Sequence, residues 1–295
     1  MKKLIKIASV ALISVSFWAS ANSGEALLPN DEMPSYSDDK LVESMQNGMQ
    51  IYMNNCMGCH SLKFQRYNRS AKDLRIPEDL MINNLMFTAE KIGDPMDNNM
   101  PTAMAEKWFG TAPPDLSLVA RARGTHWLYN YFRAFYLDDS RPLGVNNSVF
   151  NNVGMPHALT QLQGLQDKSD KVKGIENDID YAKGDIATAR EELKRGGKGR
   201  ELNKIIDESE HLIHEKENEL VKLSQNGEYF TLIKEGELSA EEFDSAMVDL
   251  VNFLDYIGEP IKRDRKSMGI FVLLFILFFT AVAYMLKKEY WKDVH

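Results

Sequence analysis

Cysteine is scarce in this chain: only Cys56 and Cys59 occur among 295 residues, separated by two positions. The sequence therefore has no second cysteine pair. A structural zinc site is closed by four ligands, most of them cysteine or histidine, so this pair supplies half of one at most. The scarcity of cysteine argues against a zinc module and leaves the single pair to other chemistry.

An excess of basic residues is also missing. Asp and Glu number 43 against 35 Lys and Arg, which gives a formal net charge of −8 at pH 7. A nucleic-acid-binding protein would show a basic stripe, so that class is disfavoured. The acidic balance suits docking of a basic partner, although on charge alone plain solubility explains it better. The length allows one or two domains.

The two cysteines stand in the run Cys56-Met57-Gly58-Cys59-His60, which has the form C-x-x-C-H. This pattern is typical of covalent attachment of a c-type haem. Two thiols add across the two vinyl groups of one porphyrin, and the spacing lets both sulfurs reach the same ring edge. His60 then turns its imidazole toward the iron, and Gly58 relaxes the backbone beside the macrocycle. A disulfide is the alternative interpretation.

The N-terminus has the pattern of a secretory signal peptide. Three lysines lie within Met1–Lys6, an apolar run follows from Ile7 to Trp18, and Ala19-Ser20-Ala21 has the A-x-A form. We expect cleavage after Ala21. Export agrees with the C-x-x-C-H run, because c-type haem is attached outside the bacterial cytoplasm.

One long uncharged apolar run, Met268–Leu286, lies near the C-terminus. As a helix it would be about 28 Å long at 1.5 Å per residue, close to the ~30 Å hydrocarbon core of a bilayer. It predicts a single transmembrane helix. Lysines and arginines flank both ends, so the positive-inside rule does not decide the orientation. The signal peptide places the bulk of the chain in the periplasm and the tail 287–295 in the cytoplasm of a bacterial inner membrane.

Four further segments have recognisable local patterns. A helix is expected from near Ser37, a short one over 77–87, a third over 118–136 that is dense in aromatics, and a fourth after the capping box that starts at Ser239. Residues 93–114 are rich in Gly, Pro and Asn and read as a loop. The apolar face of the first helix would be formed by Leu41, Met45, Met49 and Tyr52.

The sixth iron ligand is not fixed by the residues alone. Low-spin electron-transfer haem commonly takes His on one side and Met on the other. Met100 and Met155 are each followed by proline, and His126 and His157 are further possibilities. For the haem propionates, Arg121 and Arg123 are candidates, because arginine offers a planar fork to a carboxylate.

Taken in order, these pieces resemble the cytochrome c1 family, the haem subunits of ubiquinol–cytochrome c reductase (bc1) complexes. C-x-x-C-H is shared by most c-type cytochromes, whereas the Pro-Pro-Asp-Leu and Gly-Met-Pro runs with a C-terminal span are more specific. The resemblance covers most of the mature chain. It rests on Cys56–Leu62, Arg66–Arg69, Ala112–Ser117, Gly154–His157, Gly258–Pro260 and Met268–Leu286.

The resemblance implies a mainly α fold: a cytochrome c-type haem domain with long loops, and one C-terminal transmembrane helix. It implies one covalent haem c held by Cys56, Cys59 and His60. The family pattern places the sixth ligand on the methionine of the second Met-Pro run, Met155, and places Arg123 near a propionate. His60 and Met155 would thus be the metal ligands.

The resemblance also implies electron transfer rather than catalysis, because a His/Met iron has no open site. The electron would come from the Rieske iron–sulfur protein and leave to a soluble cytochrome c. Cytochrome b would lie beside the anchor, in a complex that is dimeric by family analogy. A cytochrome subunit of a terminal oxidase is the alternative, although its anchor is usually N-terminal. A haem enzyme or gas sensor becomes relevant if Met155 is not a ligand.

Residues 167–225 differ from the rest in being highly charged and regular. Apolar residues repeat in steps of three and four from Val172 to Leu193, which is an a/d heptad seam. Glycines in 195–200 interrupt it, and Ser209 and Lys216 interrupt the seam of the return arm. We expect an inserted antiparallel helical hairpin, either a tolerated surface insertion or a docking or dimer contact.

These patterns divide the chain into five parts. They are a signal peptide (1–21), a haem domain (22–166), the helical hairpin (167–225), the remainder of the haem domain (226–261), and the transmembrane anchor with its cytoplasmic tail (262–295).

Overall fold

The computed structural model describes residues 38–292 and is mainly helical, as the sequence predicts. Its described residues form two compact units, one made of 148–151 and 170–229 and the other of the remaining residues. The predicted signal peptide lies outside the described residues.

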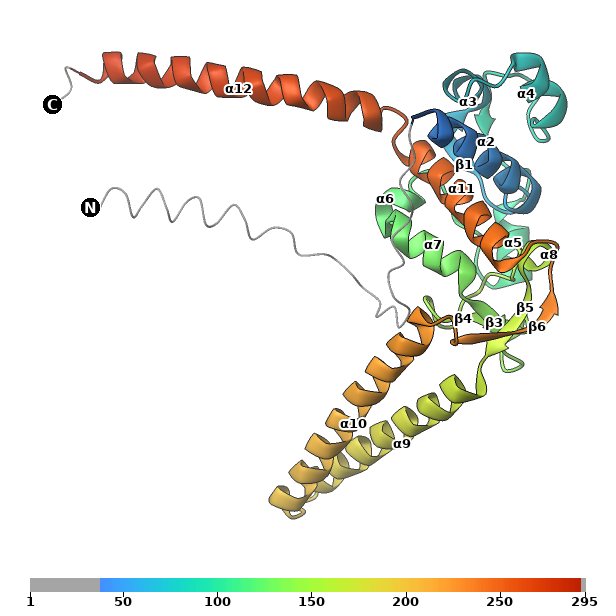
Figure 1. The fold of residues 1–295 in the computed structure, drawn as a ribbon, viewed down its shortest axis with the longest axis vertical. Coiled ribbons are helices and arrows are strands. Elements are labelled where there is room, and N and C mark those ends of the chain that lie inside the picture. Colours follow the sequence, from blue (N-terminus) through green and yellow to red (C-terminus); the bar gives the residue numbers. More distant parts are fainter. Residues whose placement is uncertain (1–37, 293–295) are drawn as a thin grey trace. The chain divides into compact units, whose positions relative to one another are not determined.

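The core of the larger unit is a pair of helices from opposite ends of the chain. Helix α2 (Asp38–Asn55) packs along α11 (Ala240–Gly258) (Figure 1). Three residues of the expected apolar face of α2, Met45, Met49 and Tyr52, are buried there, whereas Leu41 is only partly buried and its neighbour Val42 is buried instead. The Tyr52 and Phe253 rings are 5.7 Å apart. The helices approach so closely that a Cβ on Gly48 would lie 2.0 Å from the carbonyl oxygen of Asp249. The predicted capping box of Ser239 and Glu242 starts α11.

A second contact of α11 is made by the aromatic segment, which is not the single helix expected over 118–136. Helix α6 (Val119–Arg123) ends at Gly124, where φ is +87°, and α7 (Thr125–Arg133) begins a new helix. Strand β3 (Phe135–Leu137) follows and pairs antiparallel with β4 (Val145–Asn147). The left-handed glycine breaks the helix because it ends one set of backbone hydrogen bonds and redirects the chain.

The segment between α2 and α6 carries short elements. Strand β1 (Leu62–Arg66) pairs with β2 (Pro95–Met96), and between them lie α3 (Tyr67–Asp73) and α4 (Glu78–Asn84), the latter as expected.

The loop expected over 93–114 is wrong in part, since it contains β2 and the eight-residue helix α5 (Thr102–Phe109). Pro101 directly precedes α5, and Gly110 ends it with φ +78°. Pro101 and Gly110, two of the residues that suggested a loop, therefore mark the two ends of a helix.

The larger unit continues through α8 (Thr160–Gln163) into a two-stranded ribbon, β5 (Gly164–Lys168) with β6 (Phe230–Glu235). Lys168 and Phe230 are register partners, so the chain leaves this unit and returns to it at adjacent positions. That geometry allows a long insertion without disturbing the sheet.

The smaller unit contains the helical hairpin, formed by α9 (Asp170–Lys194) and α10 (Gly199–Gln225), which pack side by side (Figure 1). The predicted seam of α9 is buried from Val172 to Ala189. On α10, Ser209 is buried in the seam, and Lys216 is 3.1 Å from Asp178 of α9. The two polar interruptions are thus accommodated inside the helix pair.

The C-terminal helix α12 (Lys262–Tyr290) contains the whole predicted apolar run. Its residues Asp264–Tyr290 are long and apolar enough to cross a membrane, and none of the apolar window is buried against the protein. A helix of this kind fits a single-pass membrane anchor.

Candidate haem site

The C-x-x-C-H run forms one tight turn at the end of α2. The amide of Cys56 donates to the Tyr52 carbonyl at 2.8 Å, and the amides of Cys59 and His60 both donate to the Cys56 carbonyl, at 3.0 and 2.8 Å. Both cysteines are free thiols, Cys56 buried and Cys59 partly exposed. Burial raises the pKa of Cys56 to about 12 and also raises that of Cys59. The turn therefore presents two unoxidised sulfurs and an imidazole within five residues.

The imidazole of His60 has one nitrogen occupied and the other available. Its Nδ1 lies 2.8 Å from the carbonyl oxygen of Pro114. A carbonyl only accepts hydrogen bonds, so Nδ1 carries the proton and Nε2 keeps its lone pair. His60 is 9% exposed, and burial lowers the pKa of its imidazole, which favours the neutral form. A neutral histidine whose second nitrogen is fixed by a carbonyl has the arrangement of a metal ligand.

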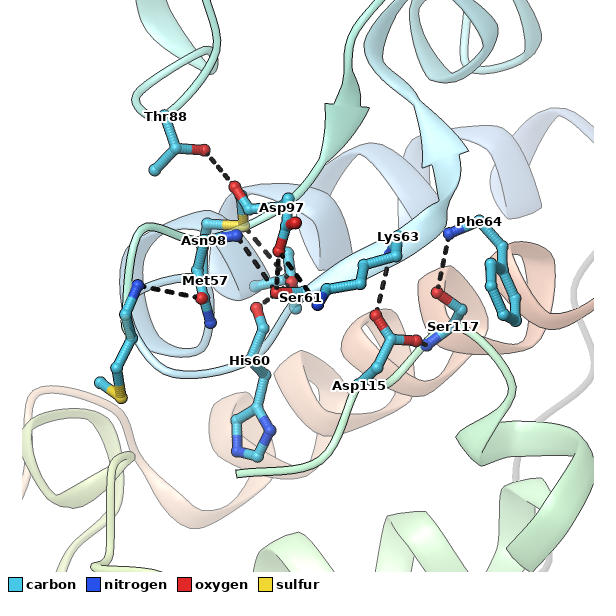
Figure 2. A network of polar contacts seen from close by, with 12 residues as sticks. Met57, His60, Ser61, Lys63, Phe64, Thr88, Asp97, Asn98, Asp115 and Ser117 are labelled. Atoms are coloured by element: carbon cyan, nitrogen blue, oxygen red, sulfur yellow. Dashed lines mark hydrogen bonds and ion pairs between the residues drawn. The ribbon is translucent and has the colours of Figure 1, made fainter. Parts of the chain in front are cut away.

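The Pro114 carbonyl is held by hydrogen bonds from β1 to the Pro-Pro-Asp-Leu run (Figure 2). Asp115 accepts from the Lys63 amide at 2.8 Å with one carboxylate oxygen and from the Ser117 amide at 2.9 Å with the other. The Ser117 hydroxyl accepts from the Phe64 amide at 3.2 Å. These bonds fix the run against β1 and thereby aim its carbonyl at His60.

A second set of hydrogen bonds fixes the chain that follows His60 (Figure 2). The Ser61 hydroxyl donates to the Asp97 carboxylate at 2.6 Å and accepts from the Asn98 amide at 3.1 Å. The buried Tyr52 hydroxyl donates to the His60 carbonyl at 2.6 Å. The backbone of the histidine is thus held from both the helix side and the loop side.

Two other predicted site residues, Met155 and Arg123, contact neighbouring side chains of α7. The Tyr131 hydroxyl lies 3.4 Å from the Met155 sulfur. The Tyr131 ring stacks on Trp127 with a centroid distance of 4.9 Å, and the Arg123 guanidinium lies 5.0 Å above the Trp127 ring. Helix α11 packs on α2, which leads into the cysteine turn, and also on α7, whose Tyr131 contacts Met155. The same core helix therefore supports both parts of the candidate site.

The remaining predicted candidates have other surroundings. Arg121 forms an ion pair with Glu259 at 3.0 Å. The His157 ring stacks on Phe135 with centroids 4.9 Å apart, and burial lowers its pKa to about 4. His126 is exposed, and Met100 is partly exposed. His157 is therefore a half-buried residue that packs as an aromatic ring against Phe135.

These residues fit a covalently bound haem. Two free thiols lie in one turn with a histidine whose Nε2 is available. The Met155 sulfur contacts Tyr131 of α7, the Arg123 guanidinium lies over Trp127 of the same helix, and α7 packs on the core helix α11. A turn of this composition on a mainly helical body with a membrane anchor defines the class of anchored c-type cytochromes.

Comparison with known proteins narrows this class. The cytochrome c1 family model matches residues 34–188 and 234–294. The chain is 39% identical to a cytochrome c1 of Allochromatium vinosum over the full length of both, and 26% identical to a cytochrome c1 of Rhodospirillum rubrum. It is also 35% identical to an ammonia monooxygenase gamma subunit of Nitrosomonas europaea, across 99% of this chain and all of the other. The chain belongs to the cytochrome c1 family, and this membership implies a c-type haem.

Sequence reasoning missed the two residues that orient the expected ligands. Pro114 acts through its main-chain carbonyl, which every residue has, so its identity carries no signal of that role. Tyr131 belongs to the predicted helical segment 118–136 that is dense in aromatics, and its hydroxyl contact with Met155 spans 24 residues. Both contacts depend on the fold.

Proposed function

We propose that this chain is the electron-transfer haem subunit of a respiratory bc1 complex, with the Rieske iron–sulfur protein as donor and a soluble c-type cytochrome as acceptor. The observation that supports this most directly is the bond between His60 Nδ1 and the Pro114 carbonyl, inside a cytochrome c1 family chain. A histidine oriented in this way is built to hold iron permanently rather than to exchange protons.

In this proposal Cys56 and Cys59 would attach one haem c, and His60 and Met155 would bind its iron. When bound, the haem supplies one-electron chemistry by cycling between its ferric and ferrous forms. Tyr131 supports Met155 as a ligand, because a thioether sulfur has a second lone pair that accepts a hydroxyl while the first binds metal. Arg123, which lies over Trp127 beside Tyr131, is the arginine we assign to a haem propionate.

The proposal includes an arrangement in the membrane. Residues 1–21 are a signal peptide, the haem domain (22–166 and 226–261) and the hairpin (167–225) are periplasmic, and 262–295 form the anchor and a cytoplasmic tail. The apolar helix α12 and the exported cofactor support this orientation. Cytochrome b and the Rieske protein are the proposed membrane partners, in a dimeric complex.

A second candidate function comes from the relative named as an ammonia monooxygenase gamma subunit, whose full length this chain matches at 35% identity. Under this alternative the same haem protein would be part of a monooxygenase assembly. Purification of the tagged chain from its own membranes separates the two: a bc1 subunit co-purifies with cytochrome b and a Rieske protein, and a monooxygenase subunit does not.

The ligand assignment is tested by low-temperature electron paramagnetic resonance (EPR) and reduced-minus-oxidised optical spectra of the full-length holoprotein. Met155→Leu should lose the low-spin His/Met signature and bind carbon monoxide when reduced, because an open iron position is created. Met100→Leu is the matched control, since it removes the other methionine that precedes a proline. A Met155→Leu protein with unchanged spectra would overturn the assignment and reopen the haem enzyme or gas sensor interpretation.

A further inference from the structure

The joint between the haem-binding body and the membrane anchor is organised around one carboxylate. Glu259 lies between the end of α11 and the start of α12, and its side chain is 15% exposed. It forms an ion pair with Arg121 of α6 at 3.0 Å, and Arg265 of α12 contacts both of its carboxylate oxygens, one of them at 3.1 Å. One side chain therefore bridges two helices that are far apart in the sequence.

The packing around this carboxylate is specific. A Cβ on Gly258 would lie 3.2 Å from Cγ of Arg121, so the arginine stem crosses directly over the glycine. Helix α6 lies beside the end of α11 at this position (Figure 1). Pro260 follows Glu259 and keeps it extended, with φ −158° and ψ 81°. Gly258 leaves room for the Arg121 side chain, and the extended backbone of Glu259 directs its carboxylate toward Arg121.

A second ion pair crosses the same joint. Lys262, the first residue of α12, contacts both carboxylate oxygens of Asp255 on α11, at 2.8 and 2.6 Å. This pair joins α12 to the helix that precedes it in sequence. Glu259 differs because, through Arg121, it also joins α12 to α6, which leads through Gly124 into the helix that carries Trp127 and Tyr131.

Arg265, which binds Glu259, stands at the start of the candidate membrane span. It lies within the span Asp264–Tyr290, three residues before the apolar run begins. An arginine at the end of a transmembrane helix directs its charge toward the interface. The bidentate bond to Glu259 gives that charge a fixed partner on the protein side, so the end of the anchor is tied to the body rather than to solvent.

We propose that Glu259 is a positioning residue: by holding Arg121 and Arg265 together it fixes the haem-binding body to its anchor, so that the haem plane takes one orientation relative to the membrane. This rests on the proposed function, which places a low-spin haem in that body. The haem of an electron carrier at a membrane surface must face its donor and acceptor. A flexible hinge at residues 258–261 would let the haem adopt a range of orientations relative to the membrane.

The test uses the full-length holoprotein in oriented phosphatidylcholine multilayers, with the ferric EPR signal recorded as the film is turned in the magnetic field. Wild type should show a sharp dependence on angle. Glu259→Gln and Arg121→Met should lose much of it, because each breaks the bridge while Met keeps the stem over Gly258. Arg121→Lys, which retains the charge, should restore it. Arg190→Met, which breaks an exposed ion pair with Glu210 between the two hairpin helices, should match wild type.

Frozen unoriented samples of every variant should give the wild-type g values, which shows that the haem site is intact. Equally sharp angular dependence in Glu259→Gln and Arg121→Met would overturn the positioning role. A wild-type protein without a low-spin signal would instead contradict the proposed function. If Glu259→Gln fails to accumulate, Arg121→Met and Arg265→Met test the bridge from its other two members.

Discussion

Nδ1 of His60 lies 2.8 Å from the carbonyl oxygen of Pro114, a residue 54 positions further along the chain. This bond decides which nitrogen of the histidine faces outward, because the carbonyl can only accept. Asp115 fixes that carbonyl by binding two amides, those of Lys63 and Ser117. The Pro-Pro-Asp-Leu run thus supports the predicted haem ligand from a distance in sequence.

We therefore expect Asp115→Ala to disturb His60, the proposed iron ligand. Removal of the carboxylate frees both amides and loosens the turn that carries Pro114, at a cost of about 1–2 kcal/mol for one exposed and one partly buried hydrogen bond. The anisotropy of the ferric EPR signal, which reports the orientation of the axial ligands, should change, and the melting temperature should fall. Asp139→Ala, at an exposed aspartate outside this network, should leave both unchanged.

Tyr131→Phe should lower the midpoint potential. A hydroxyl that donates to the Met155 sulfur withdraws electron density from it, which favours the ferrous form, so its loss stabilises the ferric form. A hydrogen bond worth about 0.5–1.5 kcal/mol corresponds to at most about 60 mV for one electron. Redox titration measures the shift.

Tyr67→Phe provides the matched control for that titration. It also removes a hydroxyl from a buried tyrosine, one that lies 3.4 Å from the Thr88 hydroxyl rather than near Met155. A fall of equal size in both variants would show that the Met155 contact is not the cause.

Gly48→Ala should destabilise the larger unit. The new Cβ would lie 2.0 Å from the Asp249 carbonyl oxygen and 2.8 Å from Cβ of Phe253, so α2 and α11 would have to move apart. Overpacking of this kind costs about 1–3 kcal/mol, and the C-x-x-C-H turn that follows α2 would shift with the helix. Thermal unfolding followed by circular dichroism tests this. Gly93→Ala, where no atom lies within 4 Å of the new Cβ, should have little effect.

Asp249 predicts a dependence of stability on pH. Burial between α2 and α11 raises its pKa, and hydrogen bonds from Ser44 and Asn47 only partly oppose the shift. A carboxyl whose pKa is higher in the folded protein stabilises folding below its unfolded pKa, and that contribution is lost as the pH rises through the folded pKa.

An Asp249→Asn variant lacks that loss. Its melting temperature relative to wild type should therefore rise between pH 4 and pH 7, whatever constant offset the altered contact with Asn47 introduces. Unfolding curves of both proteins across this range give the difference. A constant difference would mean that the carboxyl is charged throughout and that burial does not control it.

The sequence by itself determined the features that one continuous segment encodes. The C-x-x-C-H run predicts its own cofactor because both sulfurs and the histidine must reach one porphyrin. The heptad seam of 172–193 predicts a helix because its apolar stripe can be buried only against another helix. The apolar run of 268–286 predicts a helix because its length matches the hydrocarbon core of a bilayer. The helix of α2 was predictable because its buried face repeats at helical spacing.

The tertiary structure decided what depends on residues far apart. The break at Gly124 and the helix α5 were missed because glycine and proline mark helix ends as well as loops. The contacts of His60 with Pro114, of Tyr131 with Met155 and of Glu259 with Arg121 join segments that meet only after α11 packs on α2, α6 and α7. A main-chain carbonyl or a lone hydroxyl has no sequence signature, so only the fold shows which group it serves.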